Sequence, residues 1–232
     1  MKKYRIELTM ACLLLVCFYL LSRQAAVISV NQAETTKEKA GPLILVDAGH
    51  GGSDPGMIGV GGLEEKGINL SISLFLRDTL EKSGYSVIMT REEDKGLYDS
   101  SAANKKAQDM QRRVTMIQEY APVLSVSIHQ NSYQDSGVHG PQVFYYEGSV
   151  EGKKLAEAVQ NSLNQSLEVD RPREVKGNTS YYLLKRSSGP LVIVECGFLT
   201  NPEEAQKLQT KEYQQKVAGA VTEGIRTYLN TQ

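Results

Sequence analysis

Cysteine is scarce in this sequence of 232 residues, which contains three. Cys12 and Cys17 lie in an apolar stretch near the N-terminus, so Cys196 is the single cysteine of the rest of the chain. An internal disulfide is therefore excluded there. The sequence also has no C-x-x-C motif and no Cys/His cluster, so a metal site would have to use histidine and carboxylate ligands.

A charge excess of either sign is also absent. The 26 basic and 27 acidic residues give a formal net charge of -1, which provides no overall field to attract nucleic acid or an anionic membrane. Nucleic acid is thus excluded as a partner on electrostatic grounds. With 41% hydrophobic and 23% charged residues, the chain can bury one substantial core, and a single domain is the simplest division.

The N-terminus has the residue order of an export segment. Basic residues precede an apolar run over residues 8–21, and polar residues resume after it. This run of roughly 14 residues suits a signal peptide better than a membrane span of about 20, but a cleaved signal and a retained anchor both remain open, as does a buried helix. We predict a signal peptide or membrane anchor over 1–30, a linker over 31–41 and a folded domain over 42–232, with membrane contact only through the first part.

Apolar runs and amphipathic segments alternate along residues 42–232. The pattern predicts strands over 43–47, 85–89, 123–128, 142–146 and 191–195, and helices over 65–83, 113–120, 151–163 and 212–229. Such alternation is typical of an α/β fold: a single domain with a mostly parallel twisted sheet flanked by helices. Ligands of such sheets bind beyond the carboxyl ends of the strands, where His50, His129 and Glu195 are expected.

These residues suggest a metal-assisted hydrolase. The glycines around His50 let the backbone turn sharply around the imidazole, although a lone loop histidine is more often only hydrogen-bonded. Two histidines need a carboxylate to complete a hydrolytic zinc site, and Glu64 and Glu65 both qualify, although acidic residues are also favoured at the start of a helix. Glu195 follows a buried strand, where a carboxylate is costly unless it is paired with an arginine or used as a general base.

Several separated motifs together resemble one known family, the zinc-dependent N-acetylmuramoyl-L-alanine amidases, often called Amidase_3. The similar blocks follow the family's order across about residues 43–229: LVDAGHGGSDPG (45–56), EEKGINLSISLFL (64–76), MTREED (89–94), Arg113, SVSIHQNS (125–132) and VIVECGFLTNPEE (192–204). The resemblance implies that residues 42–232 are a zinc amidase catalytic domain. It favours Glu65 over Glu64, because the family's metal-binding glutamate directly precedes a Lys-x-x-Asn-Leu-like helix start.

The same resemblance implies the roles of the site residues. His50, Glu65 and His129 correspond to the family's zinc ligands, and Glu195 corresponds to its catalytic glutamate. Asn131 and Arg91 are weaker candidates for orienting the substrate, and structural hydrogen bonding is an equal alternative for both.

The implied reaction is hydrolysis of the amide between the lactyl group of muramic acid and the L-alanine of the peptidoglycan stem peptide. Within the family, the chain is most similar to the spore-cortex, germination-specific members, which prepare the cortex for muramic lactam formation. That similarity implies export to the space around the forespore cortex, joint action with a muramic acid deacetylase and an accessory activator protein. The alternatives are a zinc peptidase that cuts within the stem peptide and a non-catalytic wall-binding protein.

Overall fold

The domain that carries the motifs is built from Gly41 onward. The computed structural model describes Tyr19 and residues 41–231, and the compact unit within it runs from Gly41. The predicted export segment, apart from Tyr19, and the predicted linker up to residue 40 lie outside the described residues. None of the helices in the described part is long and apolar enough to cross a bilayer.

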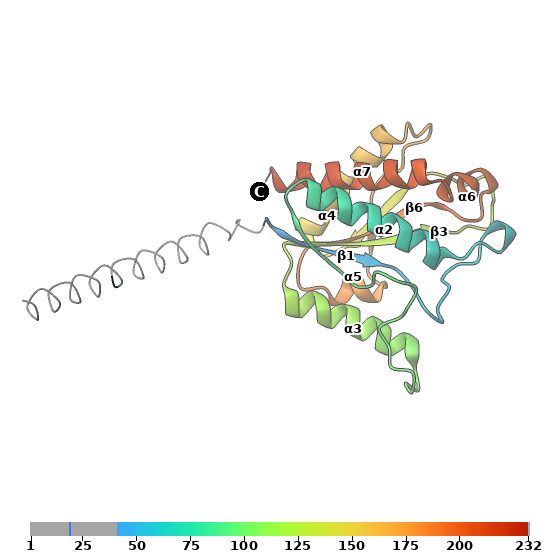
Figure 1. The fold of residues 1–232 in the computed structure, drawn as a ribbon. Coiled ribbons are helices and arrows are strands. Elements are labelled where there is room, and N and C mark those ends of the chain that lie inside the picture. The colour runs from blue at the N-terminus through green and yellow to red at the C-terminus, as the bar shows by residue number, and fades with distance from the viewer. Residues whose placement is uncertain (1–18, 20–40, 232) are drawn as a thin grey trace, which may run out of the picture. The chain divides into compact units, whose positions relative to one another are not determined.

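A six-stranded sheet forms the centre of the domain (Figure 1). Its order is β2-β1-β3-β6-β4-β5, and the neighbouring strands run parallel except for the antiparallel pair of β4 and β6. The strands are β1 (Leu43–Ala48), β2 (Ser86–Met89), β3 (Leu124–Asn131), β4 (Gln142–Tyr146), β5 (Lys176–Asn178) and β6 (Leu191–Phe198). The predicted α/β fold with a mostly parallel sheet is confirmed.

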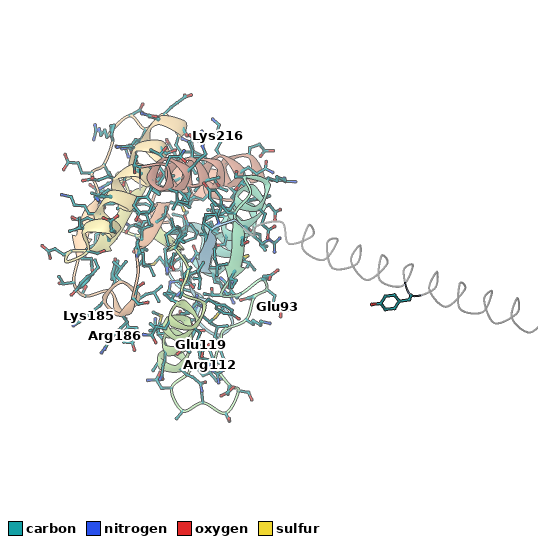
Figure 2. The ribbon with its side chains drawn as sticks, turned by 90° about the vertical axis from the view of Figure 1, so that its left-hand side faces the viewer. Glu93, Arg112, Glu119, Lys185, Arg186 and Lys216 are labelled. Atoms are coloured by element: carbon teal, nitrogen blue, oxygen red, sulfur yellow. The ribbon has the colours of Figure 1, made fainter. Side chains whose placement is uncertain are left out.

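Helices cover both faces of the sheet. Figure 1 shows α2, α4 and α7 on one face and α3 and α5 on the other. A short 3-10 helix, η1 (Val60–Gly62), precedes α2, and the α-helices are α2 (Glu65–Lys82), α3 (Lys105–Tyr120), α4 (Val150–Ser166), α5 (Tyr182–Arg186), α6 (Pro202–Leu208) and α7 (Lys211–Leu229). Charged side chains such as Lys216, Lys185 and Glu119 point outward from this assembly (Figure 2).

Strand alternation divides the buried side chains between the two faces. On β1, Ile44 and Val46 pack in the larger core with α2, α4 and α7, whereas Leu45 packs in the smaller core with α3 and α5. Side chains two residues apart share a face, so Asp47 lies on the α3 side together with Leu45. The same alternation places Glu195 on the α3 side with Ile193. Each central strand thus presents polar groups to the face that carries the smaller core.

Some helix and strand boundaries differ from the prediction. Helix α3 begins before Arg113, because the side chain of Asn104 accepts a hydrogen bond from the Ala107 N–H and caps a start at Lys105. Strands β3 and β6 extend beyond their apolar runs, to Asn131 and Phe198. The short elements β5, α5 and α6 were not predicted, since three to seven residues are too few to show a hydrophobic period.

Candidate active site and metal centre

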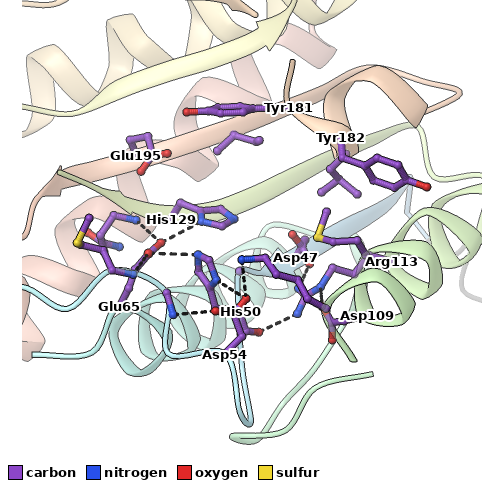
Figure 3. A pocket seen from close by; sticks show the side chains of 18 of the residues that line it. Asp47, His50, Asp54, Glu65, Asp109, Arg113, His129, Tyr181, Tyr182 and Glu195 are labelled. Carbon is purple, nitrogen blue, oxygen red and sulfur yellow. Dashed lines mark hydrogen bonds and ion pairs between the residues drawn. The ribbon is translucent and has the colours of Figure 1, made fainter. Parts of the chain in front are cut away.

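A cavity of about 580 Å³ opens at the carboxyl ends of the central strands, and Figure 3 shows its lining. His50 follows β1, His129 lies near the end of β3 and Glu195 lies near the end of β6, while Glu65 begins α2. All four side chains line this cavity. The topology therefore brings together residues that are far apart in the sequence, at the edge where parallel α/β sheets bind their ligands.

Glu65 joins the two histidines. Its Oε2 lies 3.2 Å from Nε2 of His50, and its Oε1 lies 2.9 Å from Nδ1 of His129. One ligand atom from each residue can be chosen so that all three lie within 4.8 Å of one another, and among the described residues this is the only such group of three or more metal-ligating side chains. Two imidazoles and one carboxylate are the donor set that hydrolytic zinc uses with one position open. These residues therefore fit a zinc ion.

The Glu65 carboxylate is held in place by several donors. The backbone N–H of Met57 donates to Oε2 at 2.8 Å, and the N–H of Gln130 and the side-chain amide of Asn69 donate to Oε1 at 3.0 and 3.1 Å. Burial alone would raise the pKa of Glu65. The hydrogen bonds to His129 and His50 lower it by more, so the pKa of Glu65 lies well below its usual range. Glu65 therefore stays ionised, as a metal ligand must.

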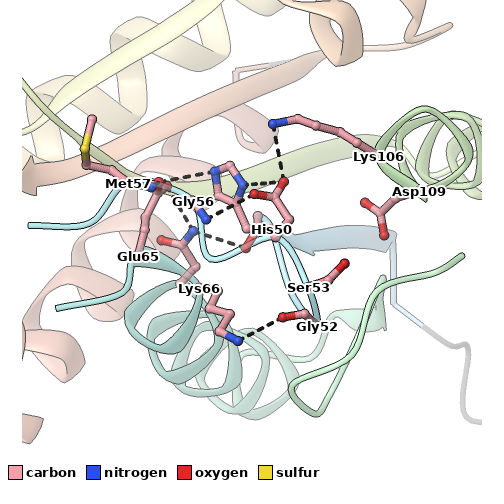
Figure 4. A network of polar contacts seen from close by, with 12 residues as sticks. His50, Gly52, Ser53, Gly56, Met57, Glu65, Lys66, Lys106 and Asp109 are labelled. Atoms are coloured by element: carbon pink, nitrogen blue, oxygen red, sulfur yellow. Dashed lines mark hydrogen bonds and ion pairs between the residues drawn. The ribbon is translucent and has the colours of Figure 1, made fainter. Parts of the chain in front are cut away.

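His50 adopts an uncommon backbone conformation. Its φ of 61° lies in the left-handed region, which costs a non-glycine residue about 1–3 kcal/mol and persists only where the surroundings enforce it. On the side of the ring away from Glu65, Nδ1 lies 3.0 Å from Oδ2 of Asp54 (Figure 3). Figure 4 shows the other side of the same ring, where Nε2 faces Glu65. A carboxylate in the position of Asp54 fixes the tautomer and orientation of a ligating imidazole.

Glu195 lies directly beside His129, because the two are register partners in the parallel pair of β3 and β6. The residue is 8% exposed, and its Oε2 has no hydrogen-bond partner. No lysine or arginine in residues 41–231 forms an ion pair with it, so the structural salt bridge that the sequence left open is not formed. Burial raises the pKa of Glu195 to about 7, the charge of Glu65 adds to the shift, and His129 and His50 oppose it.

The two weaker candidates lie in different places. Asn131 lines the cavity, and the register of β3 and β6 shifts between His129 and Asn131. Arg91 is 2% exposed and does not line the cavity. Its guanidinium donates to the backbone carbonyls of Ala48, Gly49, Lys66 and Glu93. In the structure, Arg91 thus holds the loop beneath the site instead of facing a substrate.

Asp54, Tyr181 and Tyr182 are among the cavity-lining residues to which the sequence assigned no role. Asp54 follows the glycine-rich loop in SDPG, and an acidic residue four positions after a candidate ligand was the available sign of its role. Tyr181 and Tyr182 lie at the start of α5 on the rim of the cavity (Figure 3). No pattern in the sequence pointed to them, because α5 is a single short turn of helix.

Three side chains that could hold a metal ion, with a buried carboxylate beside them at the carboxyl edge of an α/β sheet, form the arrangement that metal-assisted hydrolases use. Comparisons with known proteins narrow the class. The family described as N-acetylmuramoyl-L-alanine amidase (Amidase_3) matches residues 44–227. The chain therefore belongs to this family, and its activity is that of an N-acetylmuramoyl-L-alanine amidase.

Individual relatives match most of the chain. The germination-specific N-acetylmuramoyl-L-alanine amidase of Bacillus subtilis is 38% identical over 193 residues, which cover 82% of this chain and 81% of the relative. The CwlD amidase of Clostridioides difficile, solved in complex with the GerS lipoprotein, is 38% identical with a TM-score of 0.81, covering 83% of this chain and 100% of that one. The amidase AmiC2 of Nostoc punctiforme is 34% identical with a TM-score of 0.73, covering 82% and 99%.

Proposed function

We propose that the amidase reaction of this chain depends on a zinc ion bound by His50, Glu65 and His129. The observation that carries the proposal is the convergence of the two histidines on the ionised, buried carboxylate of Glu65. When bound, the zinc ion acts as a Lewis acid that polarises the amide carbonyl and makes a water molecule a better nucleophile at neutral pH. The bond cleaved joins the lactyl group of muramic acid to L-alanine of the stem peptide.

Glu195 is the proposed general base. Its unpaired carboxylate lies next to His129, within the cavity that the substrate amide enters. It takes a proton from the attacking water and returns that proton to the amine of L-alanine as the C–N bond breaks. Burial raises the pKa of Glu195, which makes the carboxylate a stronger proton acceptor than an exposed one, and a cation bound beside it would oppose that rise. Asn131 is assigned to orient the substrate from the end of β3.

Gly49 leaves room for the ring of His129. A Cβ at position 49 would lie 2.3 Å from Nε2 of His129, closer than any side chain tolerates. We expect Gly49→Ala to push this ring away from Glu65 and to weaken zinc binding by about 10-fold or more. Chelator competition measures the affinity. Gly219→Ala is the matched control, because the space around Gly219 in α7 is open and the change should leave zinc affinity unaltered. Equal affinities of the two variants would contradict the proposed role of His129.

Muropeptide mass spectrometry tests the reaction itself. Purified peptidoglycan digested with the chain and zinc should yield peptides with a new N-terminal L-alanine and muramic acid without a peptide, and a chelator should abolish both products. Shortened stem peptides that remain attached to the sugar would instead identify a zinc peptidase. Intact muropeptides after zinc addition would favour a non-catalytic wall-binding role.

The biological setting is proposed from the relatives. The B. subtilis relative is named as germination-specific, and the C. difficile relative was solved with a lipoprotein. We infer that this chain acts in the spore cortex with an accessory protein, after export through residues 1–30, and that a deacetylase completes muramic lactam from the same muramic acid. The matching measurement is muramic lactam in cortex muropeptides, which should be absent from spores that lack this chain.

A further inference from the structure

The turn that carries His50 has an unusual set of hydrogen-bond donors. The carbonyl oxygen of Ala48 accepts from Nε of Arg91 and from Nη1 of Arg113, both at 2.9 Å. The carbonyl of Gly49 accepts from Nη2 of Arg91 at 2.9 Å, and the carbonyl of His50 accepts from Nη2 of Arg113 at 2.7 Å. Two guanidinium groups thus bind three successive backbone carbonyls. We call Arg91 and Arg113 the carbonyl clamp.

Both arginines of the carbonyl clamp are buried, with exposures of 2% and 1%. Arg113 is paired with the carboxylates of Asp47 and Asp109. Arg91 forms no ion pair with a carboxylate of residues 41–231, and four backbone carbonyls are its hydrogen-bond acceptors. A buried guanidinium is costly unless its donors are matched, and the carbonyls that accept from Arg91 would lose this donor if an apolar residue replaced it. The placement of Arg91 therefore points to a role in holding the turn.

The turn needs such support, because His50 is in the left-handed region at φ 61°. Asp54 orients the imidazole, but it lies on the same loop and would move with it. The carbonyl clamp comes from other parts of the chain: Arg91 follows β2, and Arg113 lies in α3. Fixing the directions of three successive carbonyls fixes the peptide planes on both sides of His50 and hence the direction of its side chain.

We infer that Arg91 and Arg113 are positioning residues that hold His50 in its left-handed conformation, so that its imidazole faces Glu65 and His129 before the metal binds. This inference rests on the proposed zinc site. Arg91 does not line the cavity, and Arg113 lines it without being one of the three candidate metal ligands. Both act on the site through the backbone of His50.

Lysine substitutions test the clamp, because lysine keeps the charge but lacks the planar fork that binds two carbonyls at once. Arg91→Lys and Arg113→Lys should each weaken zinc binding by about 10–100-fold in chelator competition. Their Co²⁺ derivatives should show an altered visible absorption spectrum, which reports the geometry of the ligands. Arg112→Lys is the matched control from the next position of α3, since Arg112 binds Leu97 and Asp99 away from the turn.

The outcomes separate this inference from the zinc proposal. Zinc affinities of both clamp variants within threefold of the native chain, with an unchanged Co²⁺ spectrum, would overturn the clamp and leave the zinc site standing. A native chain that binds no stoichiometric zinc would overturn both. Far-UV circular dichroism checks folding, and Arg91→Lys provides the second variant because it breaks no ion pair. Loss of the folded spectrum in both variants would assign the arginines to folding and would also overturn the inference.

Discussion

Glu195→Gln should lower kcat by about 10²–10⁴-fold while the protein still binds one equivalent of zinc. The amide of glutamine fills the same space but cannot accept a proton, and residue 195 is not one of the three metal donors. The unfolding temperature should not fall, because the native carboxylate is buried with an oxygen that has no partner. A buried group that costs stability is expected where it serves a reaction, which is the role proposed for Glu195.

The measurement pairs amide-hydrolysis kinetics with zinc content for Glu195→Gln and Glu195→Ala. Glu212→Gln, on the exposed start of α7, is the control for loss of a glutamate charge and should retain native kinetics. If either variant at position 195 lost zinc to the same extent as His129→Ala, Glu195 would be a ligand and not the base.

Glu65→Gln should remove most of the bound zinc, with an affinity loss of more than about 100-fold, the upper range for residues that only support a ligand. Glu65 is 3% exposed and, within residues 41–231, is the one carboxylate that contacts both His50 and His129. Glutamine at this position lacks the negative charge that the ion needs. Its NH₂ group would also face N–H donors, such as those of Met57 and Gln130, that now donate to a carboxylate oxygen.

The adjacent Glu64→Gln is the control for Glu65→Gln. The Glu64 side chain is 50% exposed and lies 3.3 Å from Lys66, at the N-cap of α2 and outside the cluster of ligands. An exposed pair of this kind contributes little, so zinc content and activity should stay near those of the native chain. A larger zinc loss from Glu64→Gln than from Glu65→Gln would reverse the assignment.

Continuous apolar runs made the central sheet predictable. Strands such as 43–47 and 191–195 are buried on both faces, so their sequences show no alternation and read as parallel strands. That pattern was enough to expect His50, His129 and Glu195 at one edge. Their convergence on Glu65 depends on the phase of α2, which begins at Glu65 itself, and a one-residue shift at a helix start is beyond what spacing resolves.

The direction of the Arg91 side chain was not predictable from the sequence. The sequence left Arg91 as a weaker candidate for orienting the substrate, with structural hydrogen bonding as an equal alternative. A long arginine side chain can turn back under its own loop. Its direction depends on which backbone carbonyls lack a hydrogen-bond partner, and only the folded turn shows which these are. In the structure, the guanidinium of Arg91 donates to the carbonyls of Ala48 and Gly49. For similar reasons, Asp54 and Tyr181 emerged only from the folded structure.

Two different parts of the fold support the site: the central sheet holds His129 and Glu195, and a loop holds His50. His129 and Glu195 belong to neighbouring strands in the middle of the sheet, which are among the last parts of such a domain to open. His50, by contrast, belongs to a loop that depends on distant side chains for its shape. Substitutions that accumulate at the side chains supporting the His50 loop can therefore change the affinity for the ion. They would leave the distance between Glu195 and His129 unchanged.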